Sequence, residues 1–185
     1  SVCANRVPGR DGAVVLTQML TALGGIESEA TVTRLSDDHY YLLSAATAEI
    51  HDLDWLVQHI NSGEAVSVTN VTDEYGVLVL TGPQSRDVLA SLTDAGLDNE
   101  DGFTWMTARE ITVAGVPVRA LRVSYVGELG WELHHPMSEI KTLYDALLDA
   151  GQDHGIRPFG TYALNALRME KAYKAWGAEL TTEIS

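Results

Sequence analysis

Residues 121–135, LRVSYVGELGWELHH, place a short glycine turn between two segments that have the character of β-strands. The glycines Gly127 and Gly130 lie three residues apart, and a glycine lets a turn approach a ligand or another backbone closely. Because neighbouring residues of a strand point to opposite faces, Trp131 and Glu132 lie on opposite faces of the second strand. The stretch therefore predicts a strand–turn–strand unit with Trp131 and Leu133 on one face of the second strand and Glu132 on the other.

Glu132 is the first candidate binding residue. It lies between Trp131 and Leu133, and Tyr125 precedes the turn. A carboxylate beside apolar surface is costly unless a donor satisfies it. A heterocycle that offers two adjacent N–H groups to both carboxylate oxygens is such a donor. On spacing alone, a strand glutamate that faces solvent or pairs with an arginine stays open as the other interpretation.

The rest of the chain alternates β-rich blocks with helical segments. Strands are expected at residues 13–20, 30–35, 40–45, 65–69, 76–81, 109–113, 116–124 and 130–135, with hairpin turns at Asp37-Asp38 and Ala114-Gly115. Helices are expected at 48–60, directly after Gly82-Pro83, at 140–154 and at about 161–175. This order predicts an α+β fold with mostly antiparallel sheets and packed helices.

The helix predicted over 48–60 has an apolar face at helical spacing. This face consists of Ile50, Leu53, Leu56, Val57 and Ile60. Glu49, Asp52 and Asp54 are expected elsewhere on the surface of the helix, and Gly63 is in a suitable position to cap its end.

The second candidate binding segment is the basic stretch GTYALNALRMEKAYKAWG at 160–177. Arg168, Lys171 and Lys174 are opposed there only by Glu170. Arg168 lies next to the apolar stripe of the helix, so its guanidinium is expected at the edge of that stripe, within reach of an anion or a carboxylate. A solvated basic helix face is the alternative.

The third candidate is GGIESEATV at 24–32, where a Gly-Gly break leads into a strand. If the strand is in phase from Glu27, then Glu27 and Glu29 share one face and Ser28 lies on the other. Two carboxylates can divide acid and base work between them, whereas two exposed, chemically inert glutamates are the other interpretation.

Charge and composition exclude several classes of function. The 185 residues carry 26 acidic and 12 basic side chains, for a net charge of -14. Such an acidic protein is not expected to bind a nucleic-acid backbone or an anionic membrane. The stretch 27–101 holds 15 carboxylates but only two arginines, so the two halves can differ in their partners. No apolar run approaches the roughly 20 residues that span a bilayer, and we expect a soluble, cytoplasmic protein.

Other motifs of catalysis are missing from the sequence. The histidines and the single cysteine, Cys3, show no zinc spacing, and no Walker, GxSxG or strand-linked GxGxxG pattern occurs. His134 and His135 point to opposite faces of their strand. The sequence therefore predicts neither a metal site nor a nucleotide site, and the residues alone lead to an α+β domain with an anionic-ligand site in its C-terminal half.

Three stretches resemble the glycine-cleavage T-protein (aminomethyltransferase) superfamily. They are SYVGELGWEL at 124–133, GTYALNALRMEKAYKAWG at 160–177 and LTGPQSRDVLASLT at 80–93. Within the superfamily, the chain is most similar to the folate-binding module of dimethylglycine and sarcosine dehydrogenases. That group is also matched by TQML at 17–20, GGIESEATVTRL at 24–35 and HDLDWL at 51–56.

The resemblance implies a tetrahydrofolate-dependent one-carbon transfer module of an enzyme that demethylates N-methyl amines. In the complete dehydrogenases an upstream FAD domain oxidises the amine, and tetrahydrofolate captures the iminium to give 5,10-methylenetetrahydrofolate. Residues 1–185 are then an internal fragment, inactive by itself, in which about 1–70 and about 71–185 are portions of two subdomains. The flavin domain and a C-terminal β-domain are absent from it. A glycine-cleavage aminomethyltransferase and a non-catalytic scaffold that keeps the fold are the alternatives.

The resemblance also implies roles for individual residues. Glu132 resembles the glutamate that grips the pterin ring, while Tyr125 and Arg168 resemble an aromatic residue and an arginine of the folate site. Glu29 lies at the position of the catalytic carboxylate, where many members of the family have aspartate. The implied partners are folate, a small N-methyl amine or its iminium, and the upstream flavin domain. In a eukaryote the implied compartment is the mitochondrial matrix.

Overall fold

The computed structural model describes residues 2–184, which form two compact units. The first unit holds the residues up to Thr72 together with those from Lys174 onward, and the second holds Asp73–Tyr173. The sequence predicts one portion for the whole stretch from about 71 to 185, whereas the residues from Lys174 onward group with the first unit. The last residues join the first unit because they supply hydrogen-bond partners to its sheet, as in the bond from Ile26 N to Ile184 O at 3.2 Å.

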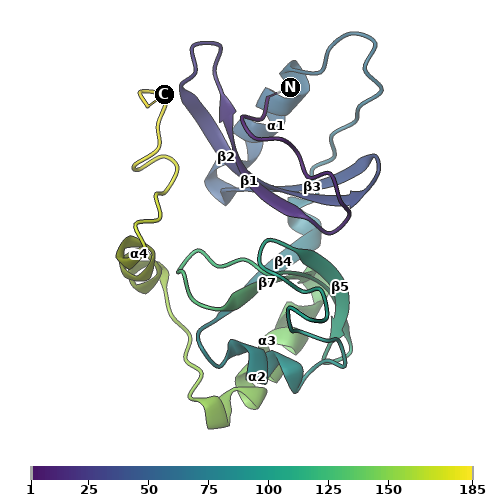
Figure 1. Cartoon of the computed structure of the whole chain (residues 1–185), viewed down its shortest axis with the longest axis vertical. Helices are drawn as coiled ribbons and strands as arrows, with labels where there is room; N and C mark the ends of the chain where they lie inside the picture. The colour runs from purple at the N-terminus through teal and green to yellow at the C-terminus, as the bar shows by residue number, and fades with distance from the viewer. Residues whose placement is uncertain (1, 185) are drawn as a thin grey trace. The chain divides into compact units, whose positions relative to one another are not determined.

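The first unit is a three-stranded antiparallel sheet with one helix beside it (Figure 1). Its elements are β1 (Val14–Leu20), β2 (Ile26–Ser36), β3 (His39–Ser44), the short 3-10 helix η1 (Ala46–Ala48) and α1 (Glu49–Gln58). The central strand is β2, which β3 joins only from Ala30 to Ser36. The turn between them falls at Asp37-Asp38, as predicted.

The segment after Tyr173 follows the remaining edge of β2, before Ala30. Its carbonyl oxygen at Thr182 lies 2.3 Å from the point where a Cβ on Gly25 would stand, so only glycine permits this approach. The Gly-Gly break before β2 therefore lets a distant part of the chain cover the start of the strand.

Helix α1 differs from the prediction in which residues it buries. Asp52 is only 3% exposed, whereas Ile50 is 65% and Val57 is 50% exposed. Asp52 turns inward because the Ser28 hydroxyl and the His51 ring satisfy its charge. The helix ends at Gln58, before Gly63, which lies in the following turn. The strand predicted at 65–69 is absent, and those residues are irregular.

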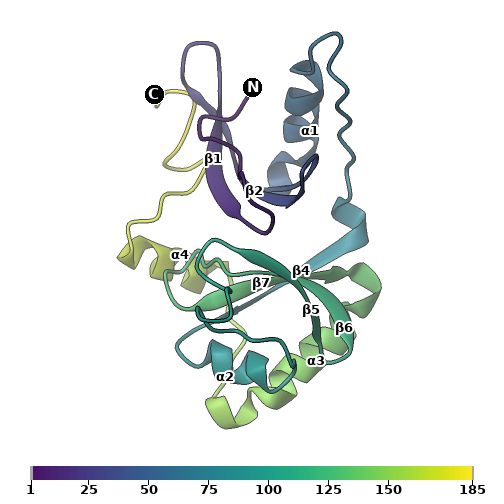
Figure 2. The same ribbon diagram turned by 45° about the vertical axis from the view of Figure 1, so that its right-hand side comes forward.

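The second unit is a four-stranded antiparallel sheet in the order β4-β7-β6-β5, with α2 and α3 on one face (Figure 2). Its elements are β4 (Tyr75–Thr81), α2 (Ser85–Ala90), β5 (Ala108–Val113), β6 (Val116–Leu121), β7 (Gly130–Pro136), α3 (Ile140–Ala150) and α4 (Thr161–Glu170), with the 3-10 helices η2 (Thr72–Glu74) at its start, η3 (Met137–Glu139) and η4 (Gln152–His154). Helices α3 and α4 end earlier than predicted. The β5–β6 hairpin turns at Ala114-Gly115, where both φ angles are positive. The predicted α+β class with antiparallel sheets is confirmed.

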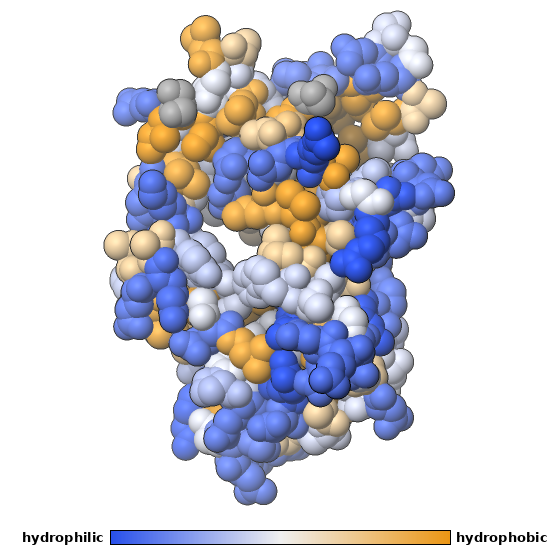
Figure 3. Space-filling view, viewed as in Figure 1, coloured by the Kyte–Doolittle hydropathy of each residue, from blue (hydrophilic) through white to orange (hydrophobic). Residues whose placement is uncertain are grey.

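The larger apolar core lies in the second unit. Trp131 and Leu133 lie on one face of β7, as predicted, and both are fully buried. The Trp131 ring meets Phe103 edge-on with centroids 6.2 Å apart. Leu143 and Leu147 of α3 close the core. Among the described residues, 17 hydrophobic side chains of this unit are buried, against five in the first unit. Figure 3 accordingly shows hydrophobic side chains on the visible surface of the first unit. No described helix is both long and apolar enough to cross a bilayer.

Candidate functional site

Hydrogen bonds connect the glycine turn of residues 127–130 to the residues at the start of α2. The carbonyl oxygen of Leu129 accepts three hydrogen bonds, from Thr81 Oγ1 at 3.1 Å, Gly82 N at 2.8 Å and Ser85 Oγ at 3.1 Å. On the other side, a Cβ at Gly130 would lie 2.9 Å from the carbonyl oxygen of Leu80. The TGPQS stretch therefore fixes the turn, and Gly130 allows it to approach β4.

A pocket of about 300 Å³ lies against this turn. It is lined by Trp105, Arg122, Gly127, Glu128, Leu129, Gly130 and Tyr173. Arg122 donates to the side chain of Asn99 and to the carbonyl of Phe103, and burial lowers the pKa of its guanidinium. Gly127 has a φ of 74° and packs against the side chain of Lys171, so the turn also contacts the end of α4. The pocket thus combines two aromatic side chains, the guanidinium of Arg122 and the backbone of the glycine turn.

Tyr125 and Arg168 lie together beside Tyr173. The rings of Tyr125 and Tyr173 are stacked, with centroids 6.5 Å apart, and Arg168 Cζ lies 6.0 Å from the centroid of Tyr125. Arg168 is only 6% exposed. Its Nη1 donates to the carbonyl of Tyr173 and its Nε to Asn165 Oδ1, both at 2.8 Å. The guanidinium therefore fixes the chain just after α4, and with it the aromatic ring that lines the pocket.

Glu132 lies on β7, beyond the same glycine turn. It occupies the face opposite Trp131, and its side chain is 21% exposed. One of its oxygens, Oε2, is 3.4 Å from Nε2 of the buried His134. The structure thus brings Tyr125 and Arg168 into direct contact and places Glu132 on the strand that follows their turn.

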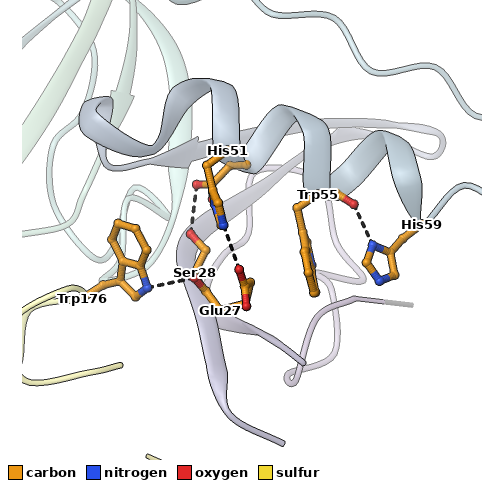
Figure 4. A network of polar contacts seen from close by, with 7 residues as sticks. Glu27, Ser28, His51, Trp55, His59 and Trp176 are labelled. Atoms are coloured by element: carbon orange, nitrogen blue, oxygen red, sulfur yellow. Dashed lines mark hydrogen bonds and ion pairs between the residues drawn. The ribbon is translucent and has the colours of Figure 1, made fainter. Parts of the chain in front are cut away.

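A second polar cluster, in the first unit, joins β2 to α1 (Figure 4). His51 Nδ1 is 2.9 Å from Asp52 Oδ1, and His51 Nε2 is 2.8 Å from Glu27 Oε1. The other oxygen of Asp52 accepts a hydrogen bond of 2.9 Å from the buried Ser28 hydroxyl. We call Glu27, Ser28, His51 and Asp52 the histidine network. In the part of the chain that the structure describes, no side chains are arranged to hold a metal ion.

The chain after α4 also reaches this network. Trp176 Nε1 donates to the backbone carbonyl of Glu27 at 3.1 Å, and its ring centroid is 6.3 Å from that of His51. Glu29 lies two residues further along β2, where its Oε2 accepts a 2.7 Å hydrogen bond from Gln18 Nε2 on β1. Glu27 therefore has a titratable partner, and Glu29 a neutral amide.

The sequence did not predict the roles of His51 and Asp52. Their partners on β2 lie 24 residues away, so no local spacing connects them. The HDLDWL stretch, noted for its resemblance to the dehydrogenase group, was the signal that could have directed attention to them. Hydrogen bonds from the His51 ring to the carboxylates of Asp52 and Glu27 raise the pKa of His51 above its ordinary value.

Comparison with known proteins gives consistent results. The sequence profile of the GCVT N-terminal domain matches residues 1–185. Human mitochondrial dimethylglycine dehydrogenase is 43% identical over 181 residues, which cover 97% of this chain and 21% of that protein. Mitochondrial sarcosine dehydrogenase of Mus musculus is 36% identical over 199 residues, which cover 100% of this chain and 21% of that protein. The chain thus spans about a fifth of these relatives. Among solved structures, glycine cleavage system aminomethyltransferase T from Bartonella henselae aligns with a TM-score of 0.74 at 27% identity, covering 90% of this chain and 42% of that one.

Proposed function

Because the chain belongs to the GCVT N-terminal domain family, we propose that it is a tetrahydrofolate-dependent one-carbon transfer module. The predicted resemblance to this superfamily is confirmed, and the relatives named above include two amine dehydrogenases. The proposed reaction is capture of the iminium of an N-methyl amine by tetrahydrofolate, which yields 5,10-methylenetetrahydrofolate and the demethylated amine. The proposed compartment is the mitochondrial matrix in a eukaryote and the cytoplasm otherwise.

The observation that carries this proposal is the pocket beside the glycine turn, with the stacked pair of Tyr125 and Tyr173 at its edge. Pockets for small molecules are mostly aromatic and apolar, with a few fixed polar groups, and begin near 300 Å³. A flat pterin ring suits such walls, and the fixed backbone of the turn offers polar groups to its edge. The residues of the second unit therefore fit a folate.

In this proposal each candidate residue of the second unit has a distinct task. Glu132 binds adjacent N–H groups of the pterin through its two carboxylate oxygens. Tyr125 supplies an aromatic surface. Arg168 holds Tyr173 in place through the carbonyl bond and adds positive charge behind Tyr125, because its own donors already serve the chain after α4.

Glu29 is the proposed catalytic carboxylate. Its hydrogen-bond partner Gln18 is neutral, and a carboxylate in this position can accept a proton or stabilise the cationic iminium. A glutamate is one methylene longer than the aspartate of many relatives. The hydrogen bond to Gln18 fixes the position of that longer side chain on the strand. FAD, in this proposal, belongs to an upstream domain that generates the iminium.

The test is tetrahydrofolate binding by the full-length gene product, measured by calorimetry. Glu132→Ala is expected to weaken binding by about 2 kcal/mol or more, roughly 30-fold, because a charged hydrogen-bonding partner is lost. Glu110→Ala is the matched control, since Glu110 is an exposed glutamate of the same sheet. Equal affinity in Glu132→Ala and wild type, with both variants folded, would contradict the pterin assignment.

A glycine-cleavage aminomethyltransferase is the second candidate, favoured by the structural similarity to aminomethyltransferase T. Its one-carbon donor would be a lipoyl-linked aminomethyl group in place of a free iminium. Supplying the full-length protein with either donor distinguishes the two, because only the correct donor gives methylenetetrahydrofolate at a rate that depends on protein concentration.

A further inference from the structure

We propose that Glu27 and His51 form a proton-donating arm that protonates the leaving amine, with Glu29 as the opposing base. This inference rests on the proposed one-carbon transfer and assigns it a second catalytic carboxylate. It starts from the histidine network, which joins three separate segments of the chain around one imidazole ring (Figure 4).

Both ring nitrogens of His51 are committed to carboxylates, at 2.9 Å to Asp52 and 2.8 Å to Glu27. A neutral imidazole donates through only one nitrogen, so both hydrogen bonds form together only when the ring is an imidazolium. The groups that face the ring are Asp52 from α1, Glu27 from β2 and the uncharged indole of Trp176. The network therefore stores one transferable proton between two carboxylates.

Asp52 orients the ring. Its side chain is 4% exposed, and the Ser28 hydroxyl holds its second oxygen. An acid buried in this way keeps the imidazole in one orientation, as the aspartate does in a catalytic triad. His51 itself is 44% exposed at its side chain, so solvent can restore its proton. Asp52 is thus the buried, fixed end of the network, and the His51 ring is its exposed part.

Glu27 and Glu29 differ in the partner that each has. Both belong to β2 and are two residues apart, so they lie toward the same side of the strand. Glu27 contacts the titratable imidazole of His51 and Glu29 a neutral amide. Two titratable groups in different environments are how one site runs acid and base chemistry at one pH. Glu27 can therefore receive a proton from His51, whereas Glu29 contacts an amide that has none to transfer.

The transfer from amine to folate moves protons at the folate nitrogens and at the amine nitrogen. Glu29 accepts the proton that the attacking folate nitrogen gives up as its lone pair bonds the methylene carbon. The bond between that carbon and the amine nitrogen breaks, and its electron pair stays on the amine. Glu27 delivers a proton to this nitrogen and receives one from His51 Nε2. The second folate nitrogen then bonds the methylene carbon, which closes the ring of 5,10-methylenetetrahydrofolate, and releases its proton to solvent. Solvent also reprotonates His51 and removes the proton from Glu29.

The experiment measures methylenetetrahydrofolate and formaldehyde formed by the full-length protein between about pH 6 and 9, alongside tetrahydrofolate binding. His51→Gln is expected to slow methylene transfer about 100-fold or more while leaving the affinity for tetrahydrofolate within about twofold. The rate of methylene transfer by the wild type is expected to fall as pH rises through the pKa of His51. The rate of the His51→Gln variant is expected not to show this fall. His59→Gln, on the same helix, is the matched control with wild-type behaviour.

Two further readouts separate a relay from a structural role. Added imidazole is expected to restore transfer to His51→Ala, because the ring site is open to solvent. Nuclear magnetic resonance titration of the isolated His51 signal is expected to show a lower pKa in Glu27→Gln. A His51→Gln enzyme that binds folate and keeps the wild-type rate and pH profile would overturn the relay alone. A wild-type protein without any folate-dependent product would overturn the proposed function and the relay with it.

Discussion

The two units of this chain are stabilised by different means. Among the described residues, the second unit buries 17 hydrophobic side chains, most of them in one core, whereas the first buries five. The first unit instead places a charged residue, Asp52, in its interior and satisfies it with Ser28 and His51. Apolar burial is insensitive to pH, and a histidine between two carboxylates is not. The comparison therefore assigns packing to one unit and titratable hydrogen bonding to the other.

The largest expected effect is on the core of the second unit. Trp131→Ala is expected to lower the free energy of unfolding by about 3–5 kcal/mol, because it removes a fully buried ring and leaves a cavity. Amide hydrogen exchange measures the loss in β6 and β7 separately from β1 and β2. Trp105→Ala, at a tryptophan that is 52% exposed, is the control and should change stability by less than about 1 kcal/mol. If Trp131→Ala lowered the free energy of unfolding by less than about 1 kcal/mol, apolar packing would not be what stabilises the second unit.

A smaller loss is expected from the interior of the first unit. Asp52→Ala leaves the buried Ser28 hydroxyl without its acceptor and removes the anchor of His51, which costs about 1–3 kcal/mol. Asp54→Ala, exposed on the same helix, should stay within about 0.5 kcal/mol of wild type. Urea unfolding monitored together with hydrogen exchange in β2 checks both values. Equal stability of the two variants would show that Asp52 is not part of what holds this unit together.

The smallest effect is a dependence of the first unit's stability on pH. The pKa of His51 is raised in the folded chain, so its imidazolium stabilises the fold. This contribution is complete below the unfolded-state pKa of about 6.5 and is lost as pH rises through the raised folded value. Hydrogen exchange in β2, followed through this window, should show the loss in wild type and not in His51→Gln. Stability that rises with pH across this window would have the wrong sign.

The sequence predicted those parts of the molecule that depend on local pattern. The alternation around Trp131 predicted that it shares one face of its strand with Leu133, and the Ala114-Gly115 turn was found where two positive φ angles allow it. The glycine turn was also predicted, but not that Thr81, Gly82 and Ser85 fasten it, because those residues lie more than 40 positions away.

The failures have a common physical cause. Asp52 was placed on the surface because aspartate is rarely buried without partners, and its partner Ser28 is remote in sequence. The run at 65–69 has strand character but no neighbouring strand to pair with among the described residues. The sequence keeps the end of the chain with the second portion, because only tertiary hydrogen bonds to β2 link it to the first unit. In each case a long-range contact, or the lack of one, decides the outcome.

The most direct test of the proposed one-carbon transfer is the product formed by the full-length protein when it oxidises an N-methyl amine with and without tetrahydrofolate. Added tetrahydrofolate is expected to divert the one-carbon unit from formaldehyde to 5,10-methylenetetrahydrofolate. Glu29→Gln is expected to abolish this diversion while folate still binds. An unchanged yield of formaldehyde at saturating tetrahydrofolate would contradict it and would favour a scaffold that has kept only the fold.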